Sequence, residues 1–230
     1  MKLGIIGAMA VEVALLKERM GDIRTESCSG MEFYIGKLGN VDAVVVQCGV
    51  GKVNAAICAQ TLCAVYGVTH LVNTGIAGSL DAKLDIGDLV VSRDAMYHDF
   101  DCVHFGYEMG RVPGMDVTAF PADDAMIRCA LQAGEEIHPG HVQLGRIASG
   151  DLFVAEKCAK NAIIEKTGAV CTEMEGAAIA HAAYRNNVPF VVLRAISDKA
   201  DDSAEMDYPT FEAIAARRCA EMVCAMARLL

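Results

Sequence analysis

Acidic side chains stand at two places where predicted secondary-structure elements meet. The apolar, β-branched run over residues 188–193 predicts a buried strand, and Asp198 follows it in RAISD. An acid just past such a strand lies at the carboxyl edge of the sheet, where open α/β sheets bind ligands. Glu173 and Glu175, in CTEMEGAAIAH, are predicted to open an Ala-rich helix that leads into this strand. The sequence therefore predicts carboxylates from adjacent elements that face one pocket.

A further acid, Glu12, lies in the first turn of the helix predicted over Met9–Met20. The positive end of the helix dipole favours a carboxylate there, so capping is a sufficient explanation for it. The preceding GIIGAM lacks the G-x-G-x-x-G spacing of dinucleotide-binding loops, and CGVGKVNAA lacks the spacing of a P-loop. These glycine turns, and NTGIAGSL further along, instead let backbone N–H groups approach a ligand.

Phe153 follows a predicted strand end in ASGDLFV, and it has two interpretations. Taken alone it is a core aromatic, whereas beside a cleft its ring can stack on a planar base. Glu173 and Glu175 are similarly ambiguous. Two residues apart on a helix, they point in different directions, and each alone is a solvated or capping carboxylate.

The bulk composition is that of a single folded domain. With 230 residues, 53% hydrophobic and 22% charged, the chain is long enough to bury a large core and too apolar to be disordered. The net charge of −10, without a basic cluster, argues against nucleic acid or an anionic membrane as a partner. No apolar stretch reaches the roughly 18 residues that span a bilayer. The start MKLGIIGAM predicts a strand, not a signal peptide.

The 10 cysteines and 6 histidines are scattered along the chain. No two cysteines have the C-x-x-C spacing and several lie in apolar stretches, so we expect reduced thiols in the core of a cytoplasmic protein. A metal centre needs clustered histidines and cysteines, and the sequence predicts none.

Predicted strands and helices alternate along the chain. Strands are expected at Lys2–Ile6, Met31–Leu38, Val41–Cys48, His70–Asn73, Ile86–Ser92, His141–Ala148 and Val188–Leu193, the second and third forming a hairpin. Helices are expected at Met9–Met20, Lys52–Tyr66, Ala122–Gly134, Ala155–Lys166 and Pro209–Leu230, with an irregular segment at Asp99–Pro113. We therefore expect one α/β domain over residues 1–230, with a central mixed β-sheet flanked by helices on both faces.

Seven motifs carry a resemblance over essentially the whole chain: MKLGIIGAMAVEVALLK, CGVGKVNAA, NTGIAGSL, DAMYHDFDCVHFGYEMGRVPG, SGDLFV, CTEMEGAAIAH and VPFVVLRAISDKADD. With them, the chain closely resembles the bacterial 5′-methylthioadenosine/S-adenosylhomocysteine nucleosidases of the purine nucleoside phosphorylase/hydrolase superfamily. The resemblance implies the three-layer αβα fold of nucleoside phosphorylases. It also implies hydrolysis of the N-glycosidic bond of both nucleosides, and of 5′-deoxyadenosine, with release of adenine in methionine salvage. It implies no metal or other cofactor.

The resemblance also implies roles for single residues. Asp198 corresponds to the acid that protonates adenine N7, and Glu12 to the base that activates water. Glu175 corresponds to the clamp on the ribose hydroxyls, with Met174 under the sugar and Phe153 stacked on adenine. The remaining implied assignments are the Val154 backbone at the edge of the base, Arg194 and Ser197 in support of the water and Asp198, and Met9, Val50, Ile76, Ala77, Gly78 and Tyr208 around the substrate.

Phe105, Tyr107 and Pro113 resemble residues that a partner subunit lends to the alkylthio pocket, so we expect a homodimer with shared active sites. Ile76 departs from the family pattern, because many members carry a serine there whose hydroxyl helps to hold the attacking water. In this chain Glu12 and Arg194 must hold the water without it.

Two alternatives to hydrolysis remain open at this stage. A nucleoside phosphorylase of the same fold needs arginines to hold phosphate. The glycine turns at Gly4–Gly7 and Gly75–Gly78 contain none, and Glu12 repels an anion. A nucleoside-binding module without turnover has no need of the Glu12 and Asp198 pair. The sequence therefore favours a hydrolase.

Overall fold

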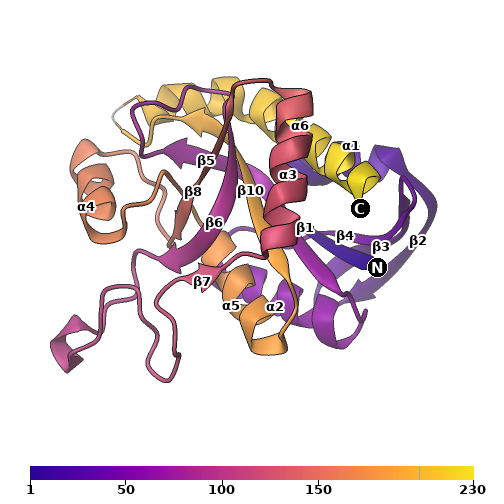
Figure 1. Cartoon of the computed structure of the whole chain (residues 1–230), viewed down its shortest axis with the longest axis horizontal. Helices are drawn as coiled ribbons and strands as arrows, with labels where there is room; N and C mark the ends of the chain where they lie inside the picture. The colour runs from indigo at the N-terminus through magenta and orange to yellow at the C-terminus, as the bar shows by residue number, and fades with distance from the viewer. Residues whose placement is uncertain (202) are drawn as a thin grey trace.

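The computed structural model describes residues 1–201 and 203–230 and shows one mixed β-sheet with helices on both faces (Figure 1). The strands are β1 (Lys2–Gly7), β2 (Met20–Cys28), β3 (Met31–Leu38), β4 (Val41–Gln47), β5 (His70–Ser79), β6 (Leu89–Tyr97), β7 (Phe120–Pro121), β8 (Val142–Ser149), β9 (Cys171–Glu173) and β10 (Phe190–Asp198). The helices are α1 (Ala10–Arg19), α2 (Lys52–Ala64), η1 (Val103–Phe105), α3 (Asp124–Ile137), α4 (Lys157–Thr167), α5 (Gly176–Asn186) and α6 (Ala204–Leu229). The predicted α/β class with a mixed sheet is confirmed.

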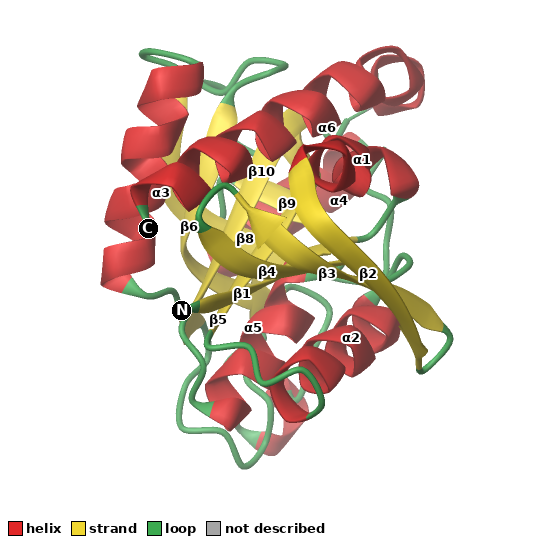
Figure 2. Ribbon diagram, turned by 90° about the vertical axis from the view of Figure 1, so that its right-hand side faces the viewer, coloured by secondary structure: helices red, strands yellow, loops and turns green. Residues whose placement is uncertain are grey.

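Two layers of helices cover the sheet. α1, α3 and α6 pack on one face, and α2 and α5 pack on the other (Figures 1 and 2). All residues of β10 are buried, and β1 is buried beyond Lys2. A strand covered on both faces reads as a continuous apolar run, which is why the sequence predicted both strands. In the described part of the chain, no helix is long and apolar enough to cross a membrane.

One half of the sheet closes on itself. β5 pairs in parallel with β1 on one side and with β10 on the other. β10 also pairs with β6, and the order β6–β8–β9–β5 leads back to β5, so these strands form a ring. From β1 the sheet extends outward through β4 and β3 to β2. Because β1, β5 and β10 are parallel neighbours, their carboxyl ends meet at one edge, where α/β sheets bind ligands.

Several predicted boundaries differ from the structure. β5 runs through the glycines of NTGIAGSL to Ser79, whereas the prediction ends the strand at Asn73. β6 begins at Leu89 and continues to Tyr97, beyond the predicted Ile86–Ser92. Asp198 is the last residue of β10, so this acid belongs to the strand and does not follow it. A glycine inside a strand can mark a place where other atoms approach the backbone closely. Gly75 and Gly78 do so here, because carboxylate oxygens lie against them.

Three further parts of the structure differ from the prediction. Glu173 and Glu175 do not open a helix together, because Glu173 ends β9 and α5 begins at Gly176. The strand β2 was not predicted, because it is exposed along most of its length and carries no apolar alternation. α6 begins at Ala204, before the predicted start at Pro209.

Candidate active site

A pocket opens at the carboxyl ends of β1, β5 and β10. Its walls come from segments that are far apart in the sequence. The lining residues are Ala8, Met9, Glu12, Val50, Ile76, Ala77, Gly78, Leu152, Phe153, Val154, Thr172, Glu173, Met174, Glu175, Ser197, Asp198 and Tyr208. The sheet thus brings most of the predicted site residues together. The exceptions are Arg194, which lies behind the wall, and the three residues from the segment between β6 and β7.

The Glu12 carboxylate is held by backbone N–H groups. Oε2 accepts hydrogen bonds from Ala8 (2.6 Å) and Met9 (3.0 Å), and Oε1 accepts one from Ile76 (3.1 Å). Burial raises the pKa of Glu12, while the nearby Arg194 and these hydrogen bonds oppose the rise. Glu12 caps the start of α1, as the simpler interpretation predicted, but the same carboxylate also lines the pocket.

The Asp198 carboxylate is held from two sides at the end of β10. Oδ1 accepts a hydrogen bond from the N–H of Ala200, and Oδ2 accepts one from the Ser197 hydroxyl, both at 2.8 Å. Burial raises the pKa of Asp198, against the effect of these two donors. A Cβ atom on Gly78 would lie 2.8 Å from Oδ1 of Asp198 and 2.7 Å from Cβ of Ala200. The glycine therefore makes room for the acid.

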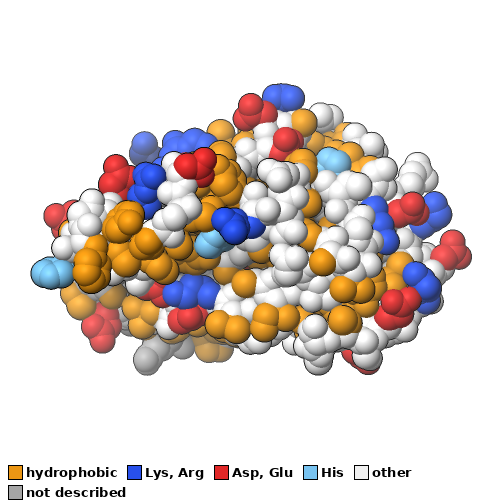
Figure 3. Space-filling view, turned by 90° about the horizontal axis from the view of Figure 1, so that it is seen from below, with side chains coloured by type: hydrophobic (Ala, Val, Ile, Leu, Met, Phe, Trp, Pro, Cys, Tyr) orange, Lys and Arg blue, Asp and Glu red, His pale blue; other side chains and the backbone are white. Residues whose placement is uncertain are grey.

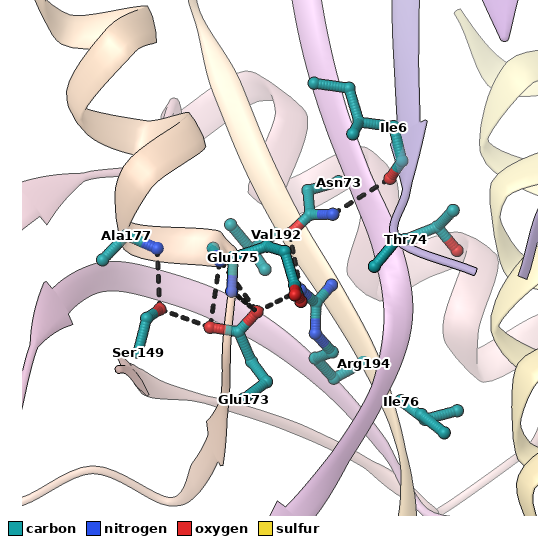
Figure 4. A network of polar contacts seen from close by, with 12 residues as sticks. Ile6, Asn73, Thr74, Ile76, Ser149, Glu173, Glu175, Ala177, Val192 and Arg194 are labelled. Carbon is teal, nitrogen blue, oxygen red and sulfur yellow. Dashed lines mark hydrogen bonds and ion pairs between the residues drawn. The ribbon is translucent and has the colours of Figure 1, made fainter. Parts of the chain in front are cut away.

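Glu175 and Glu173 occupy different environments, although they are neighbours in sequence. Oε1 of Glu175 accepts a hydrogen bond from the N–H of Gly51 (2.8 Å). Burial, with the charge of Glu173 beside it, raises the pKa of Glu175 to about 8. Burial also works to raise the pKa of Glu173, but the Arg194 guanidinium and the Ser149 hydroxyl hold it below its usual range. Figure 4 shows Glu173 between these two partners.

Arg194 is buried inside β10, behind the pocket. Nη2 pairs with Glu173 and donates to Oδ1 of Asn73 (2.6 Å), and Nη1 donates to the Leu193 carbonyl (2.8 Å). Nε is buried and has no hydrogen-bond partner among residues 1–201 and 203–230. The Nε donor of Arg194 is therefore unused within these residues.

Aromatic and apolar side chains form the rest of the wall. Phe153 is 47% exposed in the single chain, and its ring meets that of Tyr208 edge-on, with centroids 5.4 Å apart. The Tyr208 hydroxyl donates to the sulfur of Met9 (3.3 Å). Phe153 is thus not a core residue, and its ring is free to stack on a planar ligand.

Phe105, Tyr107 and Pro113 lie outside the pocket of their own chain. Phe105 is 78% exposed, and the other two are exposed as well. The structure of one chain does not test their predicted role in a partner's pocket.

Four lining residues had been given no role in the site: Ala8, Leu152, Thr172 and Glu173. The hydroxyl of Thr172 is buried without a hydrogen-bond partner in the described residues. Glu173 could have been found from its partner, because an arginine inside an apolar strand such as β10 requires a buried acid.

Possible metal ligands do gather at one place away from the pocket. Side-chain atoms of Asp88, His138 and His141 lie within 4.8 Å of one another, so these histidines are not scattered as expected. Nδ1 of His141 lies 2.8 Å from Oδ1 of Asp88, and Nη1 of Arg218 lies 3.2 Å from Nε2 of His138. The guanidinium beside the cluster repels a cation, so we assign no metal to it.

The chain is similar to known proteins of one superfamily over almost its whole length. The family model of the phosphorylase superfamily matches residues 2–228. A 5′-methylthioadenosine/S-adenosylhomocysteine nucleosidase from Treponema pallidum (strain Nichols) is 42% identical in an alignment of 244 positions that covers 96% of this chain and 90% of that protein. The chain therefore belongs to the 5′-methylthioadenosine/S-adenosylhomocysteine nucleosidase family within the phosphorylase superfamily.

Solved structures agree with this assignment. A nucleosidase of the same description from Neisseria meningitidis, in complex with methylthio-immucillin-A, matches with a TM-score of 0.97 at 34% identity and covers 100% of this chain and 99% of that one. The futalosine hydrolase of Helicobacter pylori strain 26695 matches with a TM-score of 0.95 at 32% identity, over 100% of this chain and 98% of that one.

Proposed function

We propose that the chain hydrolyses the N-glycosidic bond of 5′-methylthioadenosine and S-adenosylhomocysteine, and releases adenine and the 5-alkylthioribose. The observation that carries the proposal is the pair of buried carboxylates, Glu12 and Asp198, that face one pocket from opposite sides of β5. Both carboxylates lie against β5, since Glu12 accepts a hydrogen bond from the N–H of Ile76 and Asp198 lies beside Gly78. An acid and a base at separate places in one pocket are what inverting glycosidases require.

Asp198 is proposed as the acid on the base side of the substrate. Adenine is a poor leaving group as an anion, and protonation at N7 lets it leave as a neutral molecule. A carboxyl group can donate that proton only if it is protonated in the complex. The raised pKa of Asp198 supports this role, since burial favours the neutral form.

Glu12 is proposed as the base on the opposite side. As adenine leaves, the ribosyl group becomes cation-like, and water attacks the face away from adenine. A base with a pKa raised toward neutrality is well matched to accept the proton of that water. Arg194, whose charge acts on Glu12, is proposed to support the water through this base. Ile76 offers only its backbone N–H, which already binds Glu12.

The remaining pocket residues are proposed to hold the nucleoside. Glu175, with Met174 beneath the sugar, binds the ribose hydroxyls, and its negative charge stabilises the positive ribosyl group when it is ionised. The Phe153 ring stacks on adenine, and the backbone of Val154 binds the edge of the base. This arrangement needs no cofactor.

The alkylthio end of the pocket is proposed to be completed by a second copy of the chain. Hydrophobic side chains gather at the left end of Figure 3, over the segment between β6 and β7. Val103, Phe105 and Tyr107 are exposed there. Soluble monomers rarely expose such a patch, and a two-fold dimer buries it on both chains.

The products of a reaction with 5′-methylthioadenosine test the proposal. We expect free adenine and free 5-methylthioribose at the same rate with and without phosphate. Methylthioribose 1-phosphate as the main product would indicate a phosphorylase, and no adenine would indicate a binding module. Because a futalosine hydrolase has a very similar fold, the substrate panel should include a futalosine and 5′-deoxyadenosine.

A further inference from the structure

Glu173 has both carboxylate oxygens fully engaged. Oε1 accepts from the Ser149 hydroxyl and the N–H of Gly176, and Oε2 accepts from Arg194 and from the N–H groups of Glu175 (3.0 Å) and Gly176 (2.8 Å). The side chain is buried almost completely. An oxygen with two or three donors has little capacity left for a substrate hydroxyl. Glu173 therefore acts on other residues and not on the substrate.

Arg194 is the residue on which Glu173 acts most directly. Three acids, Glu12, Glu173 and Glu175, lie close enough for their charges to act on this guanidinium. In the described part of the chain, however, its ion pair is with Glu173. A planar guanidinium binds a carboxylate strongly in low dielectric, so whichever acid holds it is withdrawn from other partners.

The position of Arg194 is fixed from a second side as well. Oδ1 of Asn73 accepts a hydrogen bond from Nη2 (2.6 Å), and Nδ2 of Asn73 donates to the Ile6 carbonyl in β1 (2.9 Å). Figure 4 shows this chain of contacts running from β1 through Asn73 and Arg194 to Glu173. Ser149 extends it, since its hydroxyl oxygen accepts from the N–H of Ala177 in α5 (2.7 Å). The network joins the strand before Glu12 to the helix after Glu175.

We propose that Glu173 is a positioning residue whose carboxylate holds the Arg194 guanidinium away from direct ion pairs with Glu12 and Glu175. Both of these carboxylates then stay free for the water and the ribose. The same carboxylate fixes the backbone of Glu175 through its N–H. The inference rests on the proposed function, because it concerns the base and the ribose clamp of that reaction.

The decisive variant is Glu173→Gln, which keeps the shape of the side chain and removes its charge. Arg194 then loses its partner and pairs with Glu12 or Glu175. We expect kcat to fall by about tenfold to a hundredfold, with a smaller change in KM. Glu165→Gln, an exposed glutamate on α4, is the matched control and should leave both unchanged. Glu173→Asp keeps the charge and should recover part of the loss.

A pH measurement separates positioning from simple structural support. Glu175 is faced by Glu173 from β9, Arg194 from β10, Glu12 from α1 and the Cys48 thiol. Without the charge of Glu173, the pKa of Glu175 falls, and it falls further if Arg194 moves toward it. We expect the acidic limb of the kcat/KM profile to move to lower pH by about one unit in Glu173→Gln.

A double-mutant cycle gives the second readout. If Glu173 acts through Arg194, the losses caused by Glu173→Gln and Arg194→Lys should not add in the double variant. Additive losses together with an unshifted pH profile would overturn the proposal, as would wild-type kinetics of Glu173→Gln. Should this variant fail to fold, Glu173→Asp withdraws the carboxylate from Arg194 while keeping its charge; a partial loss of kcat would then support the proposal, and wild-type kinetics would overturn it. If the wild type releases no adenine, the proposed function itself fails. The proposed effect of Glu173 on Arg194 and Glu175 is then tested without substrate. Glu173→Gln should shift the pH dependence of Tm of the protein without a ligand.

Discussion

Gly75 and Glu12 are in such close contact that no larger residue fits at position 75. A Cβ atom on Gly75 would lie 2.5 Å from Oε1 of Glu12 and 3.4 Å from Nη1 of Arg194. Glu12 cannot yield easily, because backbone N–H groups hold both of its oxygens. The glycine in the middle of β5 therefore sets the place of the proposed base.

Replacing this glycine by alanine tests the relationship directly. We expect Gly75→Ala to displace Glu12 and to lower kcat by about a hundredfold or more, the usual scale for loss of a general base. Gly21→Ala is the control, since nothing lies within 4 Å of a Cβ at that position. Adenine release is the measurement. A folded Gly75→Ala protein with wild-type turnover would contradict the assigned position of the base.

The acid and base assignments predict different losses for two isosteric variants. Asp198→Asn cannot donate a proton to adenine, and we expect turnover to fall at least about a hundredfold. Glu12→Gln should bind substrate with nearly unchanged affinity, since the proposed adenine contacts lie elsewhere, but hydrolyse it slowly. Calorimetry with single-turnover hydrolysis distinguishes the two steps. Unchanged hydrolysis in either variant would remove that residue from its role.

The raised pKa of Glu175 predicts how stability depends on pH. The pKa is about 8 in the folded protein against 4.5 for an ordinary glutamate. The folded state thus binds this proton more tightly than the unfolded state. The stability that the proton contributes is fully present below about pH 4.5 and is lost as pH rises through 8.

Glu175→Gln should remove this dependence, because glutamine stays neutral. We expect the Tm of the variant minus the Tm of the wild type to increase from pH 5 to pH 8.5. The variant should nevertheless hydrolyse substrate poorly. Comparison of the two proteins cancels the other titrating groups. An identical pH dependence of Tm in both would show that Glu175 does not titrate in this range.

The shared-site dimer predicts complementation between two defective subunits. Phe105→Ala should weaken binding of the alkylthio end and leave adenine binding intact. Mixed with Asp198→Asn, it forms a heterodimer in which one site has its own Asp198 and a borrowed Phe105. Activity should then exceed that of either parent after subunit exchange.

A mixture of Asp198→Asn with Glu12→Gln is the matched control for this experiment, because every site in it lacks one catalytic carboxylate. It should stay inactive. Failure of the Phe105→Ala mixture to recover in a verified heterodimer would reject the shared site, and so would a fully active monomer.

The sequence predicted the carboxylates that line the pocket, but not the buried ion pair behind them. Asp198, Glu12 and Glu175 were identified through the motifs around them, and the pocket contains all three. Glu173 was interpreted as a solvated or capping acid, because its position was assigned to a helix. In the structure it ends β9, so its side chain points into the protein toward Arg194. The partner of a buried arginine depends on strand pairing, which periodicity does not specify.

Some strands were likewise predictable from the sequence and others were not. β1 and β10 were predictable because burial on both faces leaves an uninterrupted apolar run. The extension of β5 to Ser79 was missed, because Gly75 and Gly78 resemble a turn in sequence although they make room for carboxylates. Local patterns report how buried a segment is, but not which atoms approach it.

The ring formed by β5, β10, β6, β8 and β9 also determines how copies of this protein avoid unwanted association. Closing these strands on one another leaves β2 as the open edge at the other end of the sheet. That edge carries the exposed ion pair of Arg24 and Glu26, and its register shifts between Gly21 and Arg24. Charges and irregular register make an edge a poor template for another strand. This edge of the sheet is thereby protected against strand-to-strand aggregation.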